Sequence, residues 1–424
     1  MNNYSSLLKK IKDKKAKIGI IGLGYVGLPL AILFADNGFQ ATGFVRKSKK
    51  INDLNNGKSN LGGVDIDNDL KRVISEGKLS IKMTEGNALQ DQEVLIVCVP
   101  TPMTEKKQPD LTDLKEVARV LSLLNLSNRL IINESTVAPF MTREVFGRLG
   151  GNYFLVCSPE RVDPGNKTKT TKDIPKIIGG KDKESSILAK TLYSNIVKQS
   201  IIVSSIEVAE MTKMLENSYR AVNIALINDF AKLAGKCNID ILEVISAAST
   251  KWSFHAHYPS IGVGGHCVPK DPYYLLHLAR KHKTPMKTLE YSLLTNEGMP
   301  EYLLSKLLKI YKKGMRILVY GITYKKNIND LRGSPAIIFC RLLKEKGIDF
   351  GVYDPFITME DVGKMGFKYS PLEKVDVLVV GADHSSLEKD YLKTVDENTV
   401  IIDGRNYFKS KKGKSVLGVG RKLI

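Results

Sequence analysis

The sequence predicts an α/β protein in which two doubly wound domains are joined by a long central helix and a helical middle domain. Three observations lead to this fold class: a strand, glycine-rich turn and helix near the start, a long helical segment after residue 205, and a second strand and glycine turn from residue 316. Strands that alternate with helices predict parallel sheets with helices on both faces. Because 424 residues exceed one simple core, we expect domains at 1–204, 205–300 and 301–424.

The first domain begins with an apolar strand over residues 16–21, followed by GLGYVG at 22–27, an apolar helix over 28–36 and a second strand over 40–45. In this setting the glycines let a pyrophosphate approach the backbone at a helix N-terminus, which predicts a Rossmann-like, dinucleotide-binding domain. A tight turn without a ligand is the alternative. The expected cofactor-binding residues of the turn are Gly22, Gly24, Tyr25, Val26 and Gly27.

The end of the second strand reads Val45-Arg46-Lys47, where an acid that holds the ribose hydroxyls would be usual. A cation at this place fits the 2′-phosphate of NADP better than a free hydroxyl, so Arg46 is a candidate cofactor residue. The alternative is that both cations are simply solvated.

Three further apolar strands, over residues 93–99, 129–132 and 153–157, end in polar motifs. These motifs are VPTP with Thr101, ESTV with Thr136, and SPER with Glu160 and Arg161. The carboxyl ends of parallel strands are where an open α/β sheet binds its ligand. Glu160 is suited to general-base chemistry there, although a surface carboxylate is the alternative.

The middle of the chain predicts one long helix over residues 206–236 and a second over 239–249. Apolar residues recur along the long helix at helical spacing, which indicates a helix that spans domains or forms a dimer core; they are Val208, Met211, Leu215, Tyr219, Val222, Leu226 and Phe230. Lys213 and Asn217 are four residues apart and share one face of it. They suit an oxyanion or a sugar hydroxyl, with solvent exposure as an equal alternative.

The α/β pattern restarts with a strand and glycine at 316–321, a helix from residue 335, and strands at 349–353, 375–380 and 399–402. This second doubly wound domain has an incomplete glycine fingerprint.

A single cysteine, Cys267, lies in the glycine-rich stretch GVGGHCVPKDP at 262–272, where a small molecule could approach the backbone. The five cysteines are scattered and lack CxxC spacing, which argues for a reducing cytoplasm and against a disulfide framework or a zinc site. We therefore expect no metal.

The net charge of +19 raises the possibility of nucleic-acid binding, but the lysines are spread along the chain and no nucleic-acid motif is present. A lysine-rich surface is the favoured interpretation. The chain has no apolar run of about 20 residues and its basic start has no apolar core, so neither a membrane span nor a secretory signal is expected. A cytoplasmic enzyme follows as the expectation.

Taken in order, GLGYVGLP, VPTP, ESTV, SPER, AEMTKMLENSYRAVNIALIND, GGHCVPKDP and DGRNYF resemble the nucleotide-sugar 6-dehydrogenases of the UDP-glucose and GDP-mannose dehydrogenase superfamily. The resemblance runs from Lys17 to about Phe408. The helix around Arg220 and the histidine before Cys267 favour the N-acetylhexosamine branch. UDP-N-acetylglucosamine is the substrate that fits best, with UDP-N-acetylmannosamine and UDP-glucose as alternatives.

The resemblance implies a four-electron oxidation of the sugar's C6 alcohol to a uronic acid, with NAD as the family's usual cofactor. Cys267 would carry a thiohemiacetal and then a thioester, because a thiolate is strongly nucleophilic near neutral pH and its thioester can be hydrolysed. We expect Gly262, Gly264 and Gly265 to leave room for the sugar. Two alternatives remain: a two-electron hydroxy-acid dehydrogenase, which would not need Cys267, and a non-catalytic nucleotide-sugar-binding protein.

The same resemblance assigns the remaining residues and partners. The expected catalytic residues are Cys267, Lys213, Asn217, Asp271, Glu160 and Thr136. The expected substrate-binding residues are Glu160, Arg161, Lys213, Asn217, Arg220, Tyr258, Gly264, His266, Tyr324, Lys325 and Arg405. Arg332 matches a cofactor-side arginine, but Gly333 follows it where the family commonly has an acid. A homodimer through the central helix and a role in polysaccharide precursor synthesis are also implied.

Overall fold

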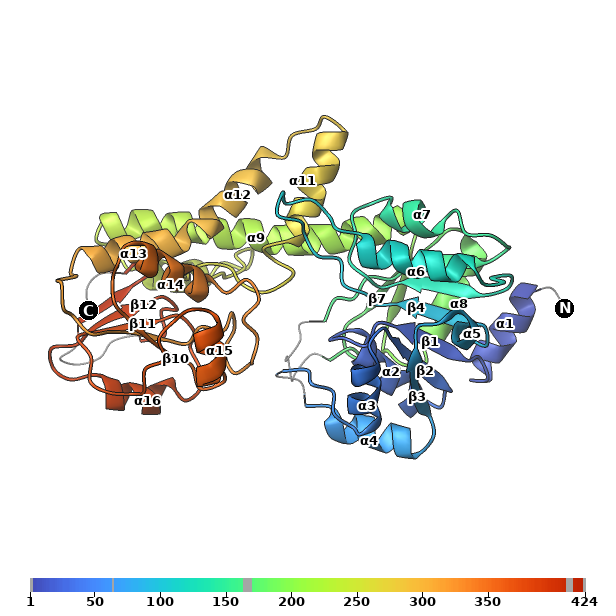
Figure 1. Cartoon of the computed structure of the whole chain (residues 1–424). Coiled ribbons are helices and arrows are strands. Elements are labelled where there is room, and N and C mark those ends of the chain that lie inside the picture. Colours follow the sequence, from blue (N-terminus) through green and yellow to red (C-terminus); the bar gives the residue numbers. More distant parts are fainter. Residues whose placement is uncertain (1–2, 63–64, 163–169, 409–414, 422–424) are drawn as a thin grey trace. The chain divides into compact units, whose positions relative to one another are not determined.

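The computed structural model describes residues 3–62, 65–162, 170–408 and 415–421, which divide into two compact units (Figure 1). Unit 1 comprises Met1–Glu216 and Tyr273–Lys283, and unit 2 comprises Asn217–Pro272 and Thr284–Ile424. The boundary falls inside the long helix α9 (Ile206–Lys236), which has the bounds expected from the sequence. The division into three domains at residues 204 and 300 stays a prediction.

Unit 1 is built on an eight-stranded sheet in the order β3-β2-β1-β4-β5-β6-β7-β8. Its strands are β1 (Ile18–Ile21), β2 (Ala41–Val45), β3 (Leu79–Met83), β4 (Val94–Val97), β5 (Leu130–Asn133), β6 (Phe154–Cys157), β7 (Lys176–Gly180) and β8 (Ser200–Val203). Neighbouring strands are parallel except β6 and β7. The order β3-β2-β1-β4-β5-β6 is that of a dinucleotide-binding sheet, which confirms the predicted fold class.

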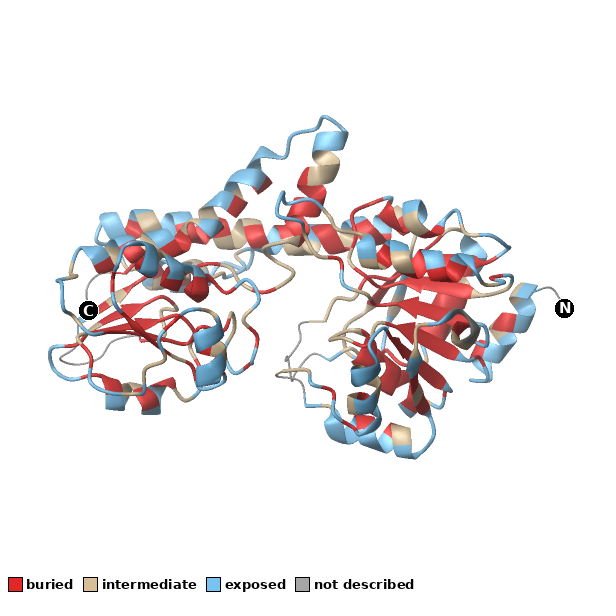
Figure 2. Cartoon of the chain, in the orientation of Figure 1, coloured by how far each residue is buried: buried red, intermediate tan, exposed pale blue. Residues whose placement is uncertain are grey.

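The helices of unit 1 are α1 (Asn3–Lys12), α2 (Gly27–Asp36), α3 (Ser48–Asn55), α4 (Asp67–Ser75), α5 (Gly86–Leu89), α6 (Thr112–Ser122), α7 (Met141–Phe146) and α8 (Lys183–Tyr193). Helix α2 is apolar almost all round and is buried over most of its length, as expected for a helix against the centre of the sheet. All residues of β1, β4, β5 and β6 are buried (Figure 2), which is typical of strands covered on both faces.

Unit 2 contains a five-stranded parallel sheet in the order β10-β9-β11-β12-β13. The strands are β9 (Ile317–Tyr320), β10 (Gly351–Tyr353), β11 (Val377–Val380), β12 (Val400–Asp403) and β13 (Ser415–Gly418). The helices are α10 (Ile241–Ala248), α12 (Lys287–Glu297), α13 (Met299–Leu308), α14 (Pro335–Glu345), α15 (Met359–Lys364) and α16 (Leu387–Thr394). This second-first-third-fourth-fifth order is also doubly wound, as predicted. Helix α11 (Asp271–Lys281) contributes its first two residues to unit 2 and the rest to unit 1.

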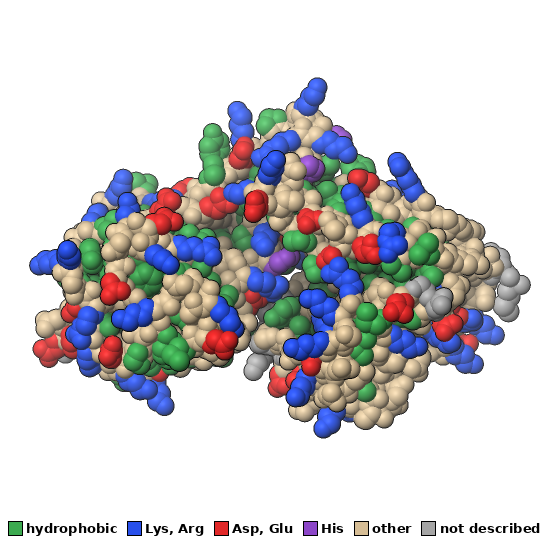
Figure 3. All heavy atoms as spheres, in the orientation of Figure 1, with side chains coloured by type: hydrophobic (Ala, Val, Ile, Leu, Met, Phe, Trp, Pro, Cys, Tyr) green, Lys and Arg blue, Asp and Glu red, His purple; other side chains and the backbone are tan. Residues whose placement is uncertain are grey.

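Lysine and arginine side chains are spread over the visible face of both units and do not gather on one element (Figure 3). Among the residues that the structure describes, no helix is long and apolar enough to cross a bilayer.

Candidate functional site

The glycine-rich turn between β1 and α2 has two glycines that the protein's own packing requires. Gly22 has φ +95°, and a Cβ there would lie 2.6 Å from the carbonyl oxygen of Cys98. A Cβ on Gly27 would lie 2.0 Å from the carbonyl oxygen of Gly22, so both positions exclude a side chain. These glycines hold the helix close to the sheet.

Gly24 differs, because no atom of the described residues lies within 4 Å of the place that its Cβ would take. The N-terminus of α2 begins after Val26, and no side chain caps it in the described structure. Open space beside the backbone and uncapped N–H groups together fit the pyrophosphate of a dinucleotide. The turn therefore has the geometry that a nicotinamide cofactor needs, while the roles of Tyr25 and Val26 stay predictions.

The polar motifs after β4, β5 and β6 lie on neighbouring strands at the same edge of the sheet as this turn. The Thr101 hydroxyl donates to the carbonyl oxygen of Thr136 at 2.7 Å, which joins two of the predicted residues directly. The hydroxyl of Tyr274, on the part of α11 in unit 1, donates to the carbonyl oxygen of Thr101. Thr101 is buried, so its hydroxyl braces the loop and is not exposed to bulk solvent.

Glu160, after β6, is partly buried and contacts a lysine that no sequence motif marks. Lys176 Nζ lies 3.0 Å from Glu160 Oε2 and 2.7 Å from Glu134 Oε2. Burial alone would raise the pKa of Glu160, but the Lys176 ammonium and two backbone N–H groups outweigh burial and lower it. Glu160 is therefore held as a carboxylate, which argues against the alternative of a solvated surface residue.

Arg161 and Lys213 are also in unit 1. The Arg161 guanidinium forms a two-bond pair with the Glu216 carboxylate, with Nε–Oε2 at 3.1 Å, and donates to the carbonyl oxygen of Pro175 at 2.7 Å. Lys213, on α9, has only 7% of its surface exposed. The sequence analysis left open whether Lys213 is solvated, and its burial decides against solvation.

The cation at the end of β2 is paired. Arg46 Nη1 lies 2.5 Å from Oδ1 of Asp113 on α6, and 61% of the arginine side chain is exposed. No acid stands among the residues that directly follow β2 in the sequence. The structure supplies one from the helix after β4.

In unit 2, Cys267 lies in the turn that leads into α11. Its carbonyl oxygen accepts the backbone N–H groups of Lys270 at 3.0 Å and Asp271 at 2.8 Å. The Asp271 side chain is buried and accepts the Asn217 amide at 2.6 Å, which places a predicted pair in direct contact. Asn217 retains a second N–H on the same nitrogen, so it can still donate to a ligand.

The glycines of this loop are required by the packing of the protein itself. A Cβ on Gly264 would lie 2.7 Å from the Tyr324 Cβ, and a Cβ on Gly265, at φ +90°, would lie 2.8 Å from the Tyr324 ring. A Cβ on Gly262 would lie 2.9 Å from the Pro335 Cβ. These glycines let the cysteine loop pack against Tyr324 and Pro335, and the expectation that they leave room for the sugar stays a prediction.

His266 and Arg332 flank the loop. Burial, and to a lesser extent the Lys270 and Arg332 cations, lower the pKa of His266 to about 4, so the imidazole is neutral near pH 7. Arg332 pairs with both oxygens of Asp330, with Nη2–Oδ2 at 2.6 Å. The acid that the sequence lacks at Gly333 is thus supplied two residues before the arginine.

The glycine turn after β9 is filled by the protein itself. Asp354, at the end of β10, accepts the N–H groups of Ile322 at 2.7 Å and Thr323 at 3.1 Å, and its Oδ2 lies 3.2 Å from His384 Nε2. Two backbone N–H groups of this turn are therefore already bonded within the protein.

Among the other predicted substrate residues, Arg405 pairs with Asp383 at 3.1 Å, and the Lys325 carbonyl oxygen accepts the Thr323 hydroxyl at 3.0 Å. Arg220 and Tyr258 are exposed, and neither side chain forms a hydrogen bond or ion pair with the described residues. The structure therefore connects Arg405 and Lys325 to the turns around β9 and β12 but gives no such anchor for Arg220 or Tyr258.

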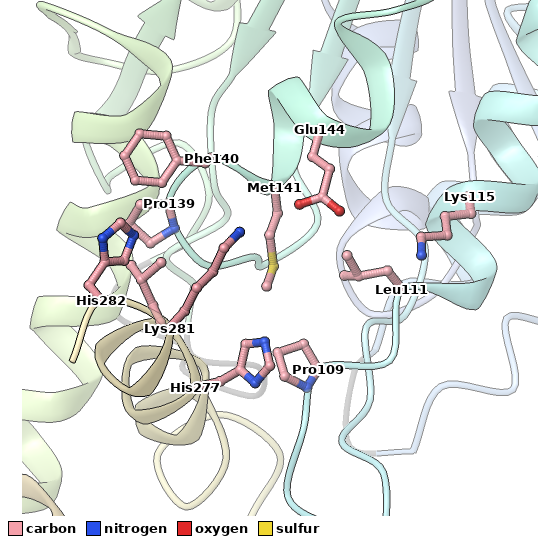
Figure 4. A pocket seen from close by; sticks show the side chains of 11 residues that line it. Pro109, Leu111, Lys115, Pro139, Phe140, Met141, Glu144, His277, Lys281 and His282 are labelled. Carbon is pink, nitrogen blue, oxygen red and sulfur yellow. The ribbon is translucent and has the colours of Figure 1, made fainter. Parts of the chain in front are cut away.

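A cavity of about 390 Å³ lies in unit 1 between α6, α7 and the end of α11 (Figure 4). Pro109, Leu111, Lys115, Pro139, Phe140, Met141, Glu144, His277, Leu278, Lys281 and His282 line it. None of them is a predicted site residue. Within the described residues no group of three or more His, Cys, Asp or Glu side chains could hold a metal ion.

The sheet order and the open glycine turn define a dinucleotide-binding protein with a second doubly wound unit. The NAD binding domain of the UDP-glucose/GDP-mannose dehydrogenase family matches residues 16–197, its central domain 207–298 and its UDP binding domain 318–410. The chain belongs to the UDP-glucose/GDP-mannose dehydrogenase family. It is a nucleotide-sugar dehydrogenase, an oxidoreductase that uses a nicotinamide cofactor and a UDP-sugar.

Relatives place it in the UDP-N-acetylhexosamine branch. It is 34% identical to a UDP-N-acetyl-D-mannosamine dehydrogenase of Pyrococcus horikoshii, over 96% of this chain and 99% of that protein. It is 36% identical to a UDP-N-acetyl-D-glucosamine 6-dehydrogenase of Pseudomonas aeruginosa, over 82% of this chain and 85% of that protein. A solved structure of the UDP-D-ManNAc dehydrogenase from Pyrococcus horikoshii superposes with a TM-score of 0.85 at 33% identity, covering 96% of this chain and 99% of that one.

Proposed function

We propose that this enzyme oxidises the C6 alcohol of a UDP-N-acetylhexosamine to the uronic acid in two successive hydride transfers. The observation that carries the proposal is the cysteine loop, in which Cys267 precedes Asp271 and Asp271 is hydrogen-bonded to Asn217. A two-electron dehydrogenase has no use for a nucleophile at this place. When bound in unit 1, a nicotinamide cofactor would supply the hydride acceptor, and two oxidised molecules in turn would be needed for the two halves of the reaction.

The chain's own residues carry the remaining chemistry. In the first half, C6 loses a hydride and the hydroxyl proton and becomes an aldehyde, to which the Cys267 thiolate adds. Lys213 and the second N–H of Asn217 stabilise the resulting oxyanion. Loss of a second hydride leaves a thioester, and water, positioned by Asp271, Glu160 and Thr136, breaks its C–S bond and releases the acid.

The acetamido group sets the expected substrate preference. We expect kcat/KM for UDP-N-acetylglucosamine or UDP-N-acetylmannosamine to exceed that for UDP-glucose by about tenfold or more, the contribution of one or two hydrogen bonds. Reduced cofactor is measured with a panel of the three UDP-sugars, and the same panel assigns the epimer. Equal or reversed values for UDP-glucose would move the enzyme to the UDP-glucose branch.

For the cofactor we propose NAD as the preferred form, because a 2′-phosphate on Arg46 would meet the Asp113 carboxylate on the same guanidinium. NADP is expected to be used with a lower kcat/KM. Arg46→Ala should weaken NADP more than NAD, whereas Asp113→Ala should favour NADP by about tenfold because it frees the arginine. If NADP gives no turnover with either the native enzyme or Asp113→Ala, Arg46 does not face the ribose.

An apolar face of α9 supports a homodimer. Tyr219, Leu226, Phe230 and Leu233 recur at helical spacing and are 51%, 52%, 52% and 61% exposed. Leu226→Asp with Phe230→Asp should convert a dimer to a monomer in sedimentation experiments. Met359→Asp, an equally exposed apolar residue on α15, should leave the mass unchanged. A native chain that sediments as a monomer would contradict the proposal. The family resemblance also leads us to propose a role in making polysaccharide precursors.

A further inference from the structure

A buried charge cluster in unit 1 surrounds Glu160. Lys176 on β7 is 2% exposed and lies between two carboxylates, 2.7 Å from Glu134 and 3.0 Å from Glu160. The other oxygen of Glu134 accepts the hydroxyl of Tyr193 from α8, and the Lys176 ammonium lies 5.1 Å from the centre of the Tyr193 ring. A buried ammonium of this kind needs paired charges on more than one side, and both carboxylates provide them.

The acceptor positions of Glu160 are almost all occupied. Its Oε1 accepts the backbone N–H groups of Arg161 at 2.7 Å and Val162 at 2.8 Å. Its Oε2 accepts Lys176. Because each carboxylate oxygen has two acceptor positions, the described residues leave one position open, on Oε2. Glu160 can therefore accept one further hydrogen bond in a fixed direction.

The charges around the carboxylate favour its ionised form. Burial raises the pKa of Glu134, whereas Lys176 outweighs burial at Glu160 and lowers the pKa there. The other titratable groups near Glu160 are Cys98 after β4 and Tyr193, and burial raises the pKa of both, so they stay neutral. The Arg161 guanidinium is paired with Glu216. Lys176 is thus the cation that decides the state of Glu160.

We propose that Lys176 is a positioning residue that keeps Glu160 as a fixed acceptor with one open position on Oε2, so that Glu160 orients water and does not take up its proton. Glu134 opposes this effect, because it shares the same ammonium. A proton on the open position of Oε2 would remove the negative charge that pairs with the partly shared Lys176 ammonium, so the ion pair opposes proton uptake. The inference rests on the proposed function, in which Glu160 faces the hydrolysis step.

The pH dependence separates this role from a purely structural one. Removing the cation in Lys176→Met should raise the pKa of Glu160. The fall in the rate of thioester hydrolysis at low pH, its acid limb, should therefore move to a pH about one unit or more higher. Glu134→Gln removes the competing carboxylate and should move the limb to lower pH. Lys176→Arg keeps the charge and should restore the native position. If Lys176 had only a structural role, Lys176→Met and Glu134→Gln would lower the hydrolysis rate but would not move the acid limb in opposite directions.

The rate is measured by rapid quench followed by intact-protein mass spectrometry of the acyl-enzyme across a pH series. Where Lys176→Met does not fold, the double variant with Glu134→Gln removes the cation and one carboxylate together and should show the same upward shift. An acid limb that stays at its native pH in the folded Lys176 variant, or that moves upward in Glu134→Gln, overturns the proposal.

A second measurement does not depend on turnover. In protein labelled with carbon-13 at the glutamate carboxyl carbon, the Glu160 signal is assigned with Glu160→Gln. It should titrate below the ordinary range of a glutamate in the native protein, and at higher pH in the Lys176 variant. An enzyme that oxidises no UDP-sugar but shows this shift disproves the proposed function alone. An active enzyme without the shift disproves the role of Lys176 alone.

Discussion

Replacement of Cys267 by serine is expected to lower the rate of uronic acid formation by about a thousandfold or more, while UDP-sugar binding changes by only a few-fold. A serine hydroxyl is a far weaker nucleophile than a thiolate near neutral pH, so the covalent adduct does not form at a useful rate. Product is followed through reduced cofactor, and binding through calorimetric titration with the UDP-sugar. The native enzyme should reduce two cofactors for each sugar and release no free aldehyde.

Cys237 provides the matched control, because it is an exposed free cysteine just after α9 and lies outside the cysteine loop. Cys237→Ser should retain native turnover. A ratio of one reduced cofactor per sugar, or full turnover by Cys267→Ser, would contradict the four-electron mechanism and favour a simple alcohol dehydrogenase.

Much of the fold could be predicted because its central strands are short, continuous apolar runs followed by recognisable turns. The strands β1, β2, β4, β5 and β6 and the helix α9 fall where the sequence indicates them. The sequence analysis did not predict β3, β7, β8 and β13. The strands β8 and β3 are only partly buried, and β13 includes an exposed serine. The strand β7 is buried, but its sequence KIIGG holds a lysine and two glycines, so its apolar run is too short to mark a central strand.

The sequence predicts the motifs of the candidate site but not the residues that pair with them. The partners that set the charge of these motifs come from elsewhere in the fold: Asp113 reaches Arg46 from α6, and Lys176 reaches Glu160 from β7. No local pattern marks them, because each pairing depends on which strands are neighbours. Gly264 and Gly265 are likewise required because the cysteine loop packs against Tyr324, which follows β9, and this contact is visible only in the folded structure.

Glu210 on α9 holds the loop that begins α7, and its loss should destabilise unit 1 strongly. Its carboxylate is 1% exposed and accepts the backbone N–H groups of Phe140 at 2.7 Å and Thr142 at 2.8 Å. Phe140 itself has a φ of +78°, a left-handed conformation that a bulky residue adopts only when its surroundings impose it. The two hydrogen bonds to Glu210 are part of that constraint.

Glu210→Ala should therefore lower the unfolding free energy of unit 1 by about 2–6 kcal/mol, because each buried N–H left without an acceptor costs about 1–3 kcal/mol. Denaturant unfolding measures this difference. Glu144 is an exposed carboxylate on α7, the helix that begins in this loop, and Glu144→Ala should change the unfolding free energy by less than about 0.5 kcal/mol.

The pH dependence tests the same contact. Burial raises the pKa of Glu210 from 4.5 to about 7, so the folded state binds a proton more tightly than the unfolded chain does between these values. The contribution of Glu210 to stability is then fully present below pH 4.5 and is lost as pH rises towards about 7. The difference between the native protein and Glu210→Ala should shrink over this window. A difference that is small at every pH, or that grows as pH rises, would show that Glu210 does not hold the Phe140 loop as a buried acid.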